Sequence, residues 1–187
     1  MALSGHEAFE LNELLMSCTN SITCMGVFIN QAKDPELKSM IGKHLNAHIQ
    51  DYNIKVQWAT KQACTEKLNV PSAPTANANA TMTGTPQPQP VMPDPHSTSF
   101  NDRAIGTSYL LTLKRAGREY AWATMEAANP ELRSFLMDAF TMAANHAFEV
   151  AQWMTKKGFY PGEPASLSYI EKLSQTYQPV RELAGVR

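Results

Sequence analysis

Two histidines and one carboxylate in this sequence could together bind a metal ion. Asp51 and His146 occupy equivalent positions in an internal repeat described below, and His48 lies one helical turn from Asp51. Two imidazoles and a carboxylate are a known ligand set for transition metals. One hypothesis is therefore a degenerate mononuclear site formed by His48, Asp51 and His146. The alternative, which we prefer, is that Asp51 and His146 form a buried hydrogen-bonded pair in an apolar core.

A di-iron centre of the type found in four-helix bundles is the next chemistry to test. It needs Glu-x-x-His on each of two helices and one glutamate from each of the other two. The residues three positions before the inward histidines are all apolar in this chain: Ile41, Leu45 and Ala143 precede His44, His48 and His146. The spacing His44-x-x-x-His48 resembles a two-histidine clamp without its glutamate, and we expect His44 at the helix edge.

Glutamates on the predicted helices do not complete such a centre. Four of them lie about a quarter-turn from the centre of an apolar stripe, at roughly 100° per residue, where carboxylates are normally solvated: Glu13, Glu119, Glu126 and Glu149. At the repeat spacing, Cys24 is the position equivalent to Glu119, so the two halves do not supply a symmetric pair of bridging glutamates. Glu119 remains only an additional ligand for the hypothetical site of His48, Asp51 and His146. We therefore predict no metal-binding, catalytic or cofactor-binding residue, and no cofactor.

Other signals of catalysis are missing from the sequence. It contains no nucleophile motif, phosphate-binding loop or dinucleotide fingerprint, so we predict that the protein is not an enzyme. Cys18, Cys24 and Cys64 are an odd number of cysteines without zinc-like spacing. We interpret them as reduced, buried thiols of an intracellular protein.

An internal repeat defines the elements that position these residues. Residues 34–39 read DPELKS and residues 129–134 read NPELRS, while residues 57–61 read QWATK and residues 152–156 read QWMTK. Both matches have a spacing of 95 (129 − 34 and 152 − 57). Two matches in one register indicate duplication of a structural unit.

Helix signals surround both copies of the repeat. Ser4 and Glu7 have the form of a capping box, and Asp34-Pro35 and Asn129-Pro130 are N-caps followed by proline at the first helical position. The second helix is predicted over residues 35–67, and Gly158 is a candidate to end the fourth. The inward stripe of the second helix is predicted to be Leu37, Ile41, Leu45, His48, Tyr52 and Ala59, and that of the fourth Leu132, Leu136, Ala139, Ala143, His146, Val150 and Trp153.

These elements predict an all-α fold of one domain over residues 1–187. A first helical hairpin (5–67) and a second (102–158) are joined by a proline-rich crossover (68–101), and a tail (159–187) carries a short helix near residues 165–178. Two duplicated antiparallel hairpins with one long crossover make a ferritin-like four-helix bundle. The crossover is long enough to run the length of the bundle.

Composition limits the partners that the chain can have. Among 187 residues the net charge is −1, which predicts no general attraction to nucleic acid. No apolar segment approaches membrane-spanning length. The pattern of a signal peptide, a basic segment followed by an apolar run, is not seen at the N-terminus. We therefore expect no nucleic-acid binding and no membrane insertion.

The second half resembles a known family. The residues that carry the resemblance are LLTLKRAGREYAWA at 110–123, EAANPELR at 126–133, NHAFEV at 145–150 and QWMTKKGFYP at 152–161. They are similar to the spore coat protein F (Coat F) family of endospore-forming bacteria, whose members have a ferritin-like bundle. Residues 7–11 (EAFEL) and 34–37 (DPEL) extend the resemblance to the first half.

The resemblance implies a structural, non-enzymatic component of the endospore coat or a close relative. Such a protein is made in the mother-cell cytoplasm and then assembles on the spore coat, with other coat proteins as partners; a homodimer is a further option. The family supplies no catalytic residues. Two alternatives stay open: a ferritin-like metal-binding or redox protein with the degenerate site at His48, Asp51 and His146, and a bundle that binds partners through its tail from Pro161 onward.

Overall fold

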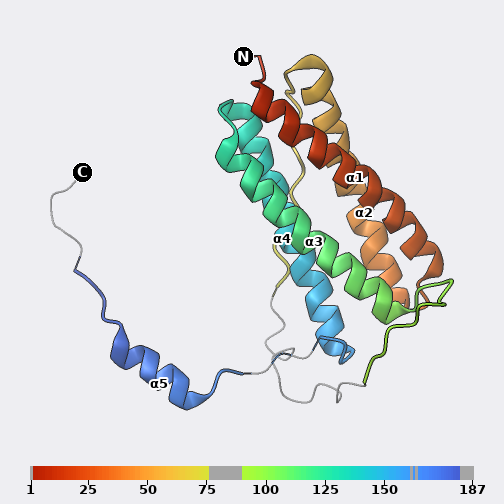
Figure 1. The fold of residues 1–187 in the computed structure, drawn as a ribbon, viewed down its shortest axis with the longest axis vertical. Helices are drawn as coiled ribbons and strands as arrows, with labels where there is room; N and C mark the ends of the chain where they lie inside the picture. The colour runs from red at the N-terminus through yellow and green to blue at the C-terminus, as the bar shows by residue number, and fades with distance from the viewer. Residues whose placement is uncertain (1, 76–89, 161, 163, 182–187) are drawn as a thin grey trace.

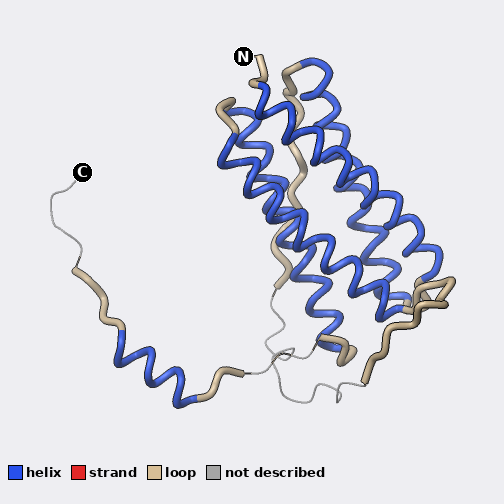
Figure 2. Tube along the Cα trace, viewed as in Figure 1, coloured by secondary structure: helices blue, strands red, loops and turns tan. Residues whose placement is uncertain are grey.

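A computed structural model of the chain describes residues 2–75, 90–160, 162 and 164–181. Within these residues it contains helices and no strand (Figure 2). The helices are α1 (Gly5–Gln31), α2 (Pro35–Lys61), α3 (Asp102–Glu126), α4 (Pro130–Lys156) and α5 (Leu167–Thr176). Helices α1 to α4 form a four-helix bundle, so the predicted all-α class is confirmed. Residues 76–89 of the predicted crossover, with Pro86 and Pro88, and Pro161 and residues 182–187 of the tail lie outside the described residues.

Each hairpin begins its second helix with the predicted cap. The Asp34 side chain accepts a hydrogen bond from the Leu37 N–H, and Asn129 accepts from the N–H groups of Glu131 and Leu132. Both helices are 27 residues long, and their first and last residues are 95 positions apart, which agrees with the register of the repeat. The N-cap of α1 is the complete capping box of Ser4 and Glu7.

Helix α2 ends earlier than the sequence predicted. The prediction placed its end near Lys67, whereas the helix stops at Lys61 and Gln62 adopts a left-handed conformation with φ of 56°. This turn lets the chain fold back, so that Leu68 is buried against the bundle. The Gln50 side chain fastens the returning segment by donating to the Lys67 carbonyl and accepting from the Asn69 N–H.

The crossover then follows the bundle toward its opposite end. Figure 1 shows residues 62–75 descending beside α2 and α4, where the Asn145 side chain donates to the Pro71 carbonyl at 2.9 Å. At the far end, the Asp102 carboxylate accepts hydrogen bonds from the N–H groups of Lys33 and Asp34. As a result α3 runs antiparallel to both α1 and α4, as expected for two antiparallel hairpins joined by a crossover that runs the length of the bundle.

The ends of the chain differ in how they pack. Gly158 has φ of 72°, and the Phe159 N–H donates to the Met154 carbonyl, so α4 ends in a Schellman motif at the predicted glycine. Helix α5 begins at Leu167, after the N-cap Ser166, and has no buried residue, and Figure 1 shows it apart from the bundle. No described helix is long and apolar enough to cross a membrane.

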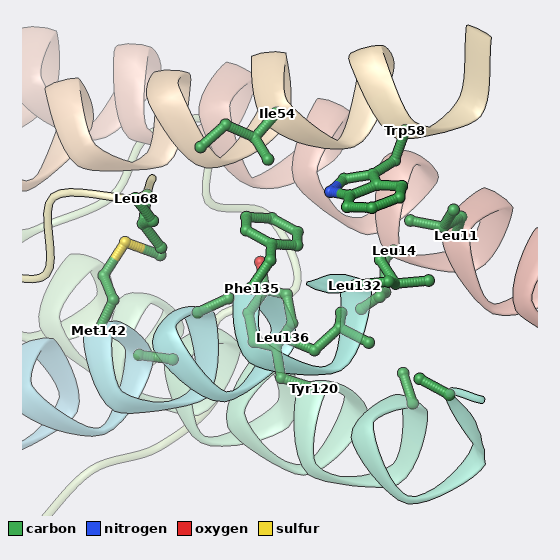
Figure 3. Close-up of a cluster of buried hydrophobic side chains, with 14 residues drawn as sticks. Leu11, Leu14, Ile54, Trp58, Leu68, Tyr120, Leu132, Phe135, Leu136 and Met142 are labelled. Atoms are coloured by element: carbon green, nitrogen blue, oxygen red, sulfur yellow. The ribbon is translucent and has the colours of Figure 1, made fainter. Parts of the chain in front are cut away.

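The bundle core consists of two apolar clusters with a polar layer between them. One cluster includes Leu11, Trp58 and Leu136, and Figure 3 shows its side chains converging from all four helices and from Leu68. The other lies toward the opposite end and includes Met25 and Trp153. The side chains that make up this polar layer are buried at intermediate heights of the helices: Cys18, His44, His48, Asp51, Lys55 and His146.

The inward stripe of α2 differs from the prediction. Residues at mean steps of 3.5 are buried: Leu37, Ile41, His44, His48, Asp51, Lys55 and Trp58. The prediction chose Leu45, Tyr52 and Ala59 in place of the buried neighbours His44, Asp51 and Trp58, and none of the three chosen residues is buried. Apolar character was a misleading guide at the first two positions, because polar residues occupy the core there. In α4, by contrast, every predicted stripe residue is buried.

Candidate functional site

The strongest concentration of chemical groups in the described residues is the polar layer of the core. It divides into two parts that share helix α2. We call Cys18, Asp51, Lys55 and Tyr120 the ionic cluster, and His44, His48, His146, Tyr109 and Glu149 the histidine cluster. Asp51 and His48 are three residues apart on α2, so the two clusters occupy successive turns.

The ionic cluster joins three helices around one lysine. The Lys55 Nζ donates to Asp51 Oδ2 at 2.5 Å, to the Tyr120 hydroxyl at 2.8 Å and to Cys18 Sγ at 2.9 Å. Asp51 Oδ2 also accepts from the Tyr120 hydroxyl at 2.7 Å and from Cys18 Sγ at 3.1 Å. The side chains of Asp51 and Lys55 are both 0% exposed. Since an ammonium has three N–H donors, Lys55 is fully satisfied without water.

Electrostatics in the ionic cluster follow from burial and close charges. Burial by itself lowers the pKa of Lys55, but the adjacent Asp51 carboxylate and Cys18 outweigh it, and the pKa is raised. Burial and the Asp51 charge raise the pKa of the Cys18 thiol to about 11, and the same causes raise the pKa of Tyr120. At neutral pH the cluster therefore holds an ammonium, a thiol and a phenol around Asp51.

The histidine cluster links α2 to α3 and α4. His146 Nδ1 lies 3.3 Å from His48 Nε2, and the His44 and His146 rings stack with centroids 3.7 Å apart. His44 Nδ1 lies 3.0 Å from the Tyr109 hydroxyl, and His44 Nε2 lies 3.0 Å from the Glu149 carboxylate. Every ring therefore has a polar partner, and Glu149 lies where the cluster approaches the surface with 29% of its side chain exposed.

Burial keeps these histidines neutral. Desolvation lowers the pKa of His48 to about 4, against a partly compensating effect of Asp51. The pKa of His146 is lowered even further by burial and by the neighbouring His44 and His48, and that of His44 is lowered in spite of Glu149. Stacking of two imidazoles requires this neutrality, because two adjacent imidazolium ions would repel each other.

The preferred sequence hypothesis for Asp51 and His146 was wrong. The two residues do not bond to each other: Asp51 faces Lys55, Tyr120 and Cys18, whereas His146 contacts His48 and stacks on His44. The physical reason is that Lys55, one turn along the same helix, offers the buried carboxylate a full opposite charge, which a neutral imidazole cannot match.

The structure brings together only part of the hypothetical metal-ligand set. His48 and His146 are in contact, but Asp51 Oδ2 is engaged by its own cluster. Among the described residues, no group of three or more His, Cys, Asp or Glu side chains is arranged to hold a metal ion. The ligand chemistry would suit a metal only if Asp51 left Lys55, and that would leave a buried ammonium unpaired.

The other candidates are placed as follows. His44 was expected at the helix edge, yet it is 1% exposed. Its ring can be buried because both ring nitrogens have hydrogen-bond partners, Tyr109 and Glu149. The Glu149 carboxylate therefore contacts the buried His44 ring and is not simply solvated. Glu119 stays outside the core and bonds to Ser17 and Arg115. Glu126 lies 3.5 Å from His6 at the surface.

Sequence reasoning missed Lys55, Tyr109 and Tyr120 as members of the polar layer. A usable signal existed for Lys55, since Asp51-x-x-x-Lys55 has the i, i+4 spacing of a helical ion pair in a segment of inward positions. For the two tyrosines, no spacing rule shows which polar groups their hydroxyls meet across helices.

Spore coat proteins are among the known proteins to which this chain is similar. Residues 101–163 match the Coat F domain, which covers α3 and α4 and confirms the resemblance seen in the sequence. The chain is 24% identical over 182 residues to the spore coat protein F-like protein YhcQ of Bacillus subtilis, covering 95% of this chain and 81% of that protein. A crystal structure of a candidate spore coat protein from Bacillus halodurans aligns with a TM-score of 0.65 and 14% identity, covering 89% of this chain and 96% of the other. That likeness shows the fold.

Proposed function

We propose that this chain, which carries a Coat F domain in its second hairpin, is a structural, non-enzymatic component of the bacterial endospore coat. The observation that carries the proposal, beyond the named relatives, is the enclosure of the polar layer. Asp51 and Lys55 are 0% exposed and His146 is 2% exposed, and their polar atoms bond mainly to one another. A group that acts on a substrate has to meet it, so self-contained bonding supports a packing role.

In this proposal His48, Asp51 and His146 specify the packing of the bundle and do not bind a metal. Buried polar networks whose members are satisfied favour one arrangement of the helices over others, because a shifted helix would leave charges or imidazoles unpaired. The ion pair of Asp51 and Lys55 fixes α2 against α1 and α3, and the stacked rings fix α2 against α4. The bundle is thereby a scaffold of defined shape.

The tail supplies a surface for contacts with other coat proteins. Helix α5 places Leu167 and Ile170 one turn apart, with exposed fractions of 82% and 49%, and its C-cap residue Tyr177 is 71% exposed. An amphipathic helix with an uncovered apolar side gains free energy by docking on a partner. We place the assembly contacts of the protein here, with other coat proteins as partners.

Localisation during sporulation tests the proposed function. A fluorescent fusion of the full chain is expected first in the mother-cell cytoplasm and then as a ring at the spore periphery. A matched fusion that ends at residue 160 keeps the bundle but lacks α5, and we expect it to form a weaker ring. Uniform fluorescence in vegetative cells, together with unchanged spore resistance and germination after gene deletion, would contradict a coat function.

A further inference from the structure

We propose that Lys55 and Cys18 form a covalent bridge through a single oxygen atom, Nζ–O–Sγ, which joins α2 to α1 inside the core. The two atoms face each other at 2.9 Å, with Cys18 5% exposed and Lys55 0% exposed. Hydrogen bonds from N–H to oxygen have lengths of about 2.9 Å, and sulfur is larger than oxygen. The observed separation is therefore short for an N–H···S contact.

The separation fits an oxygen bridge better than a direct bond. One oxygen bonded to both atoms would hold nitrogen and sulfur only slightly closer than 2.9 Å, so the helices need hardly move. A direct nitrogen–sulfur bond, the sulfenamide, would require the two atoms to come much closer than 2.9 Å inside a packed core. Geometry thus selects the bridged product among the oxidised forms of this pair.

The reaction that forms the bridge balances with dioxygen as the oxidant. The Lys55 ammonium, the Cys18 thiol and one dioxygen give the Nζ–O–Sγ link, one water and one proton. Bonds from oxygen to nitrogen and to sulfur form, while the O–O bond, the S–H bond and two N–H bonds break. Sulfur and nitrogen each lose two electrons, and dioxygen accepts all four.

Neighbouring groups suit proton release at this site. Asp51 Oδ2 contacts both reacting side chains, and Asp51 Oδ1 has no hydrogen-bond partner among the described residues, so the carboxylate can take the proton that is released. The remaining cysteines lack this setting: Cys24 Sγ contacts the Asn20 side chain, and Cys64 Sγ contacts Gln57. Oxidation by this route is therefore confined to Cys18.

The bridge has a consequence for stability that does not depend on coat residence. It would close a loop from residue 18 to residue 55, and a cross-link restricts the unfolded chain more than the folded one. The oxidised protein should therefore unfold at a higher temperature than the reduced protein. A reductant should reverse the effect, because the sulfur–oxygen bond can be cleaved by a thiol.

Intact mass measurement of the untagged full chain tests the proposal. Protein kept in air-saturated buffer is expected to gain the mass of one oxygen and lose that of two hydrogens, whereas anaerobic protein keeps its mass. Trypsin should then leave residues 1–33 linked to residues 44–61 with no cleavage after Lys55, and dithiothreitol should separate the two peptides and restore the original mass.

Matched variants identify the residues involved. Cys24→Ser and Cys64→Ser should still show the mass gain, whereas Cys18→Ser, a change of nearly equal size, should abolish it while circular dichroism remains helical. Three results would overturn the proposal: a Cys18 thiol that stays fully titratable after aerobic incubation, a Cys18 sulfenic or sulfinic acid with Lys55 still cleavable, or a mass gain that persists in Cys18→Ser.

Discussion

The Asp51–Lys55 pair buries two opposite charges in the core. Burying two charges costs several kcal/mol each, and a good contact only about repays that cost. The pair therefore adds little net stability compared with two well-packed apolar residues, but it makes misplacement of α2 costly. Its value lies in specifying the arrangement of α1, α2 and α3.

Lys55→Met should destabilise the protein by about 3–5 kcal/mol, because it leaves the Asp51 carboxylate buried without its partner. Denaturant unfolding followed by circular dichroism measures the loss. The double variant Asp51→Leu with Lys55→Met should recover most of it. Lys156→Met, which breaks the exposed pair with Glu36, should cost less than about 1 kcal/mol. An equal loss in both single variants would show that the core pair has no special role.

The histidine cluster makes stability depend on pH. The pKa of His48 is about 4 in the folded protein, against roughly 6.5 for an unfolded chain. Between these values the unfolded state binds more protons, so the free energy of unfolding should fall as pH drops from about 6.5 to 4, by roughly 3 kcal/mol for this residue. Nearby Asp51 opposes the shift, and His44 and Lys55 add to it.

Urea titrations from pH 7 to pH 5 measure this slope, above the range in which most carboxylates titrate. His48→Gln should reduce the slope, with His44 and His146 supplying the remainder, whereas His96→Gln, at an exposed position, should leave it unchanged. The interpretation of a neutral, buried cluster fails if His48→Gln keeps the full slope.

Residue-level chemistry was only partly predictable from sequence. The inward positions of His48 and His146 were visible from helical spacing, and that of Asp51 from its equivalence to His146 in the repeat. Their partners were not, because a pairing such as Lys55 with Tyr120 depends on how α2 and α3 rotate about their axes. One local signal, the spacing of Asp51 and Lys55, was available and would have identified the ionic cluster.

At the scale of elements, one glycine sets how closely two helices pack. A Cβ atom added at Gly106 in α3 would come within 2.8 Å of the Trp153 ring in α4, whereas one added at Gly26 in α1 would meet no atom within 4 Å. Alanine favours a helix over glycine by about 1 kcal/mol. Substitution by alanine at Gly26 therefore tests helix propensity alone, whereas the same substitution at Gly106 tests propensity and packing together.

Gly106→Ala should lower the free energy of unfolding by about 1–3 kcal/mol, because the indole has to move in a packed core. Gly26→Ala should instead raise it, by up to about 1 kcal/mol. Thermal or urea unfolding of both variants makes the comparison. A stabilising effect of Gly106→Ala would mean that α3 and α4 are less closely packed than described.

Helix boundaries were predictable where side chains fix them. Asp34, Asn129 and Gly158 mark ends that local hydrogen bonding determines, and the structure has them there. The end of α2 was misjudged because it depends on Leu68 folding back to the core, a contact outside the helix. The inward stripe of α2 was misjudged because polar residues occupy its core positions.

At the scale of the whole molecule, the two halves keep one plan but divide the polar layer unequally. At the repeat spacing of 95, the α2 residues His44, His48 and Lys55 correspond to Ala139, Ala143 and Val150 in α4. Three core positions that carry large polar side chains in one hairpin thus carry small apolar side chains in the other.

The tail should be dispensable for the stability of the bundle. Helix α5 has no buried residue, so removing residues 161–187 should change the melting temperature by no more than a surface substitution would. Differential scanning calorimetry of the truncated and full chains measures this. A large drop in melting temperature would place α5 on the bundle and weaken its role in partner contacts.

We propose that the polar core packs the helices and does not bind a metal. Metal analysis of untagged protein, purified without chelators or a histidine tag, tests this most directly. We expect iron, zinc and manganese well below one equivalent per chain, and His146→Ala to lower stability without changing metal content. Stoichiometric metal that disappears in His146→Ala, while the protein remains helical, would contradict the account.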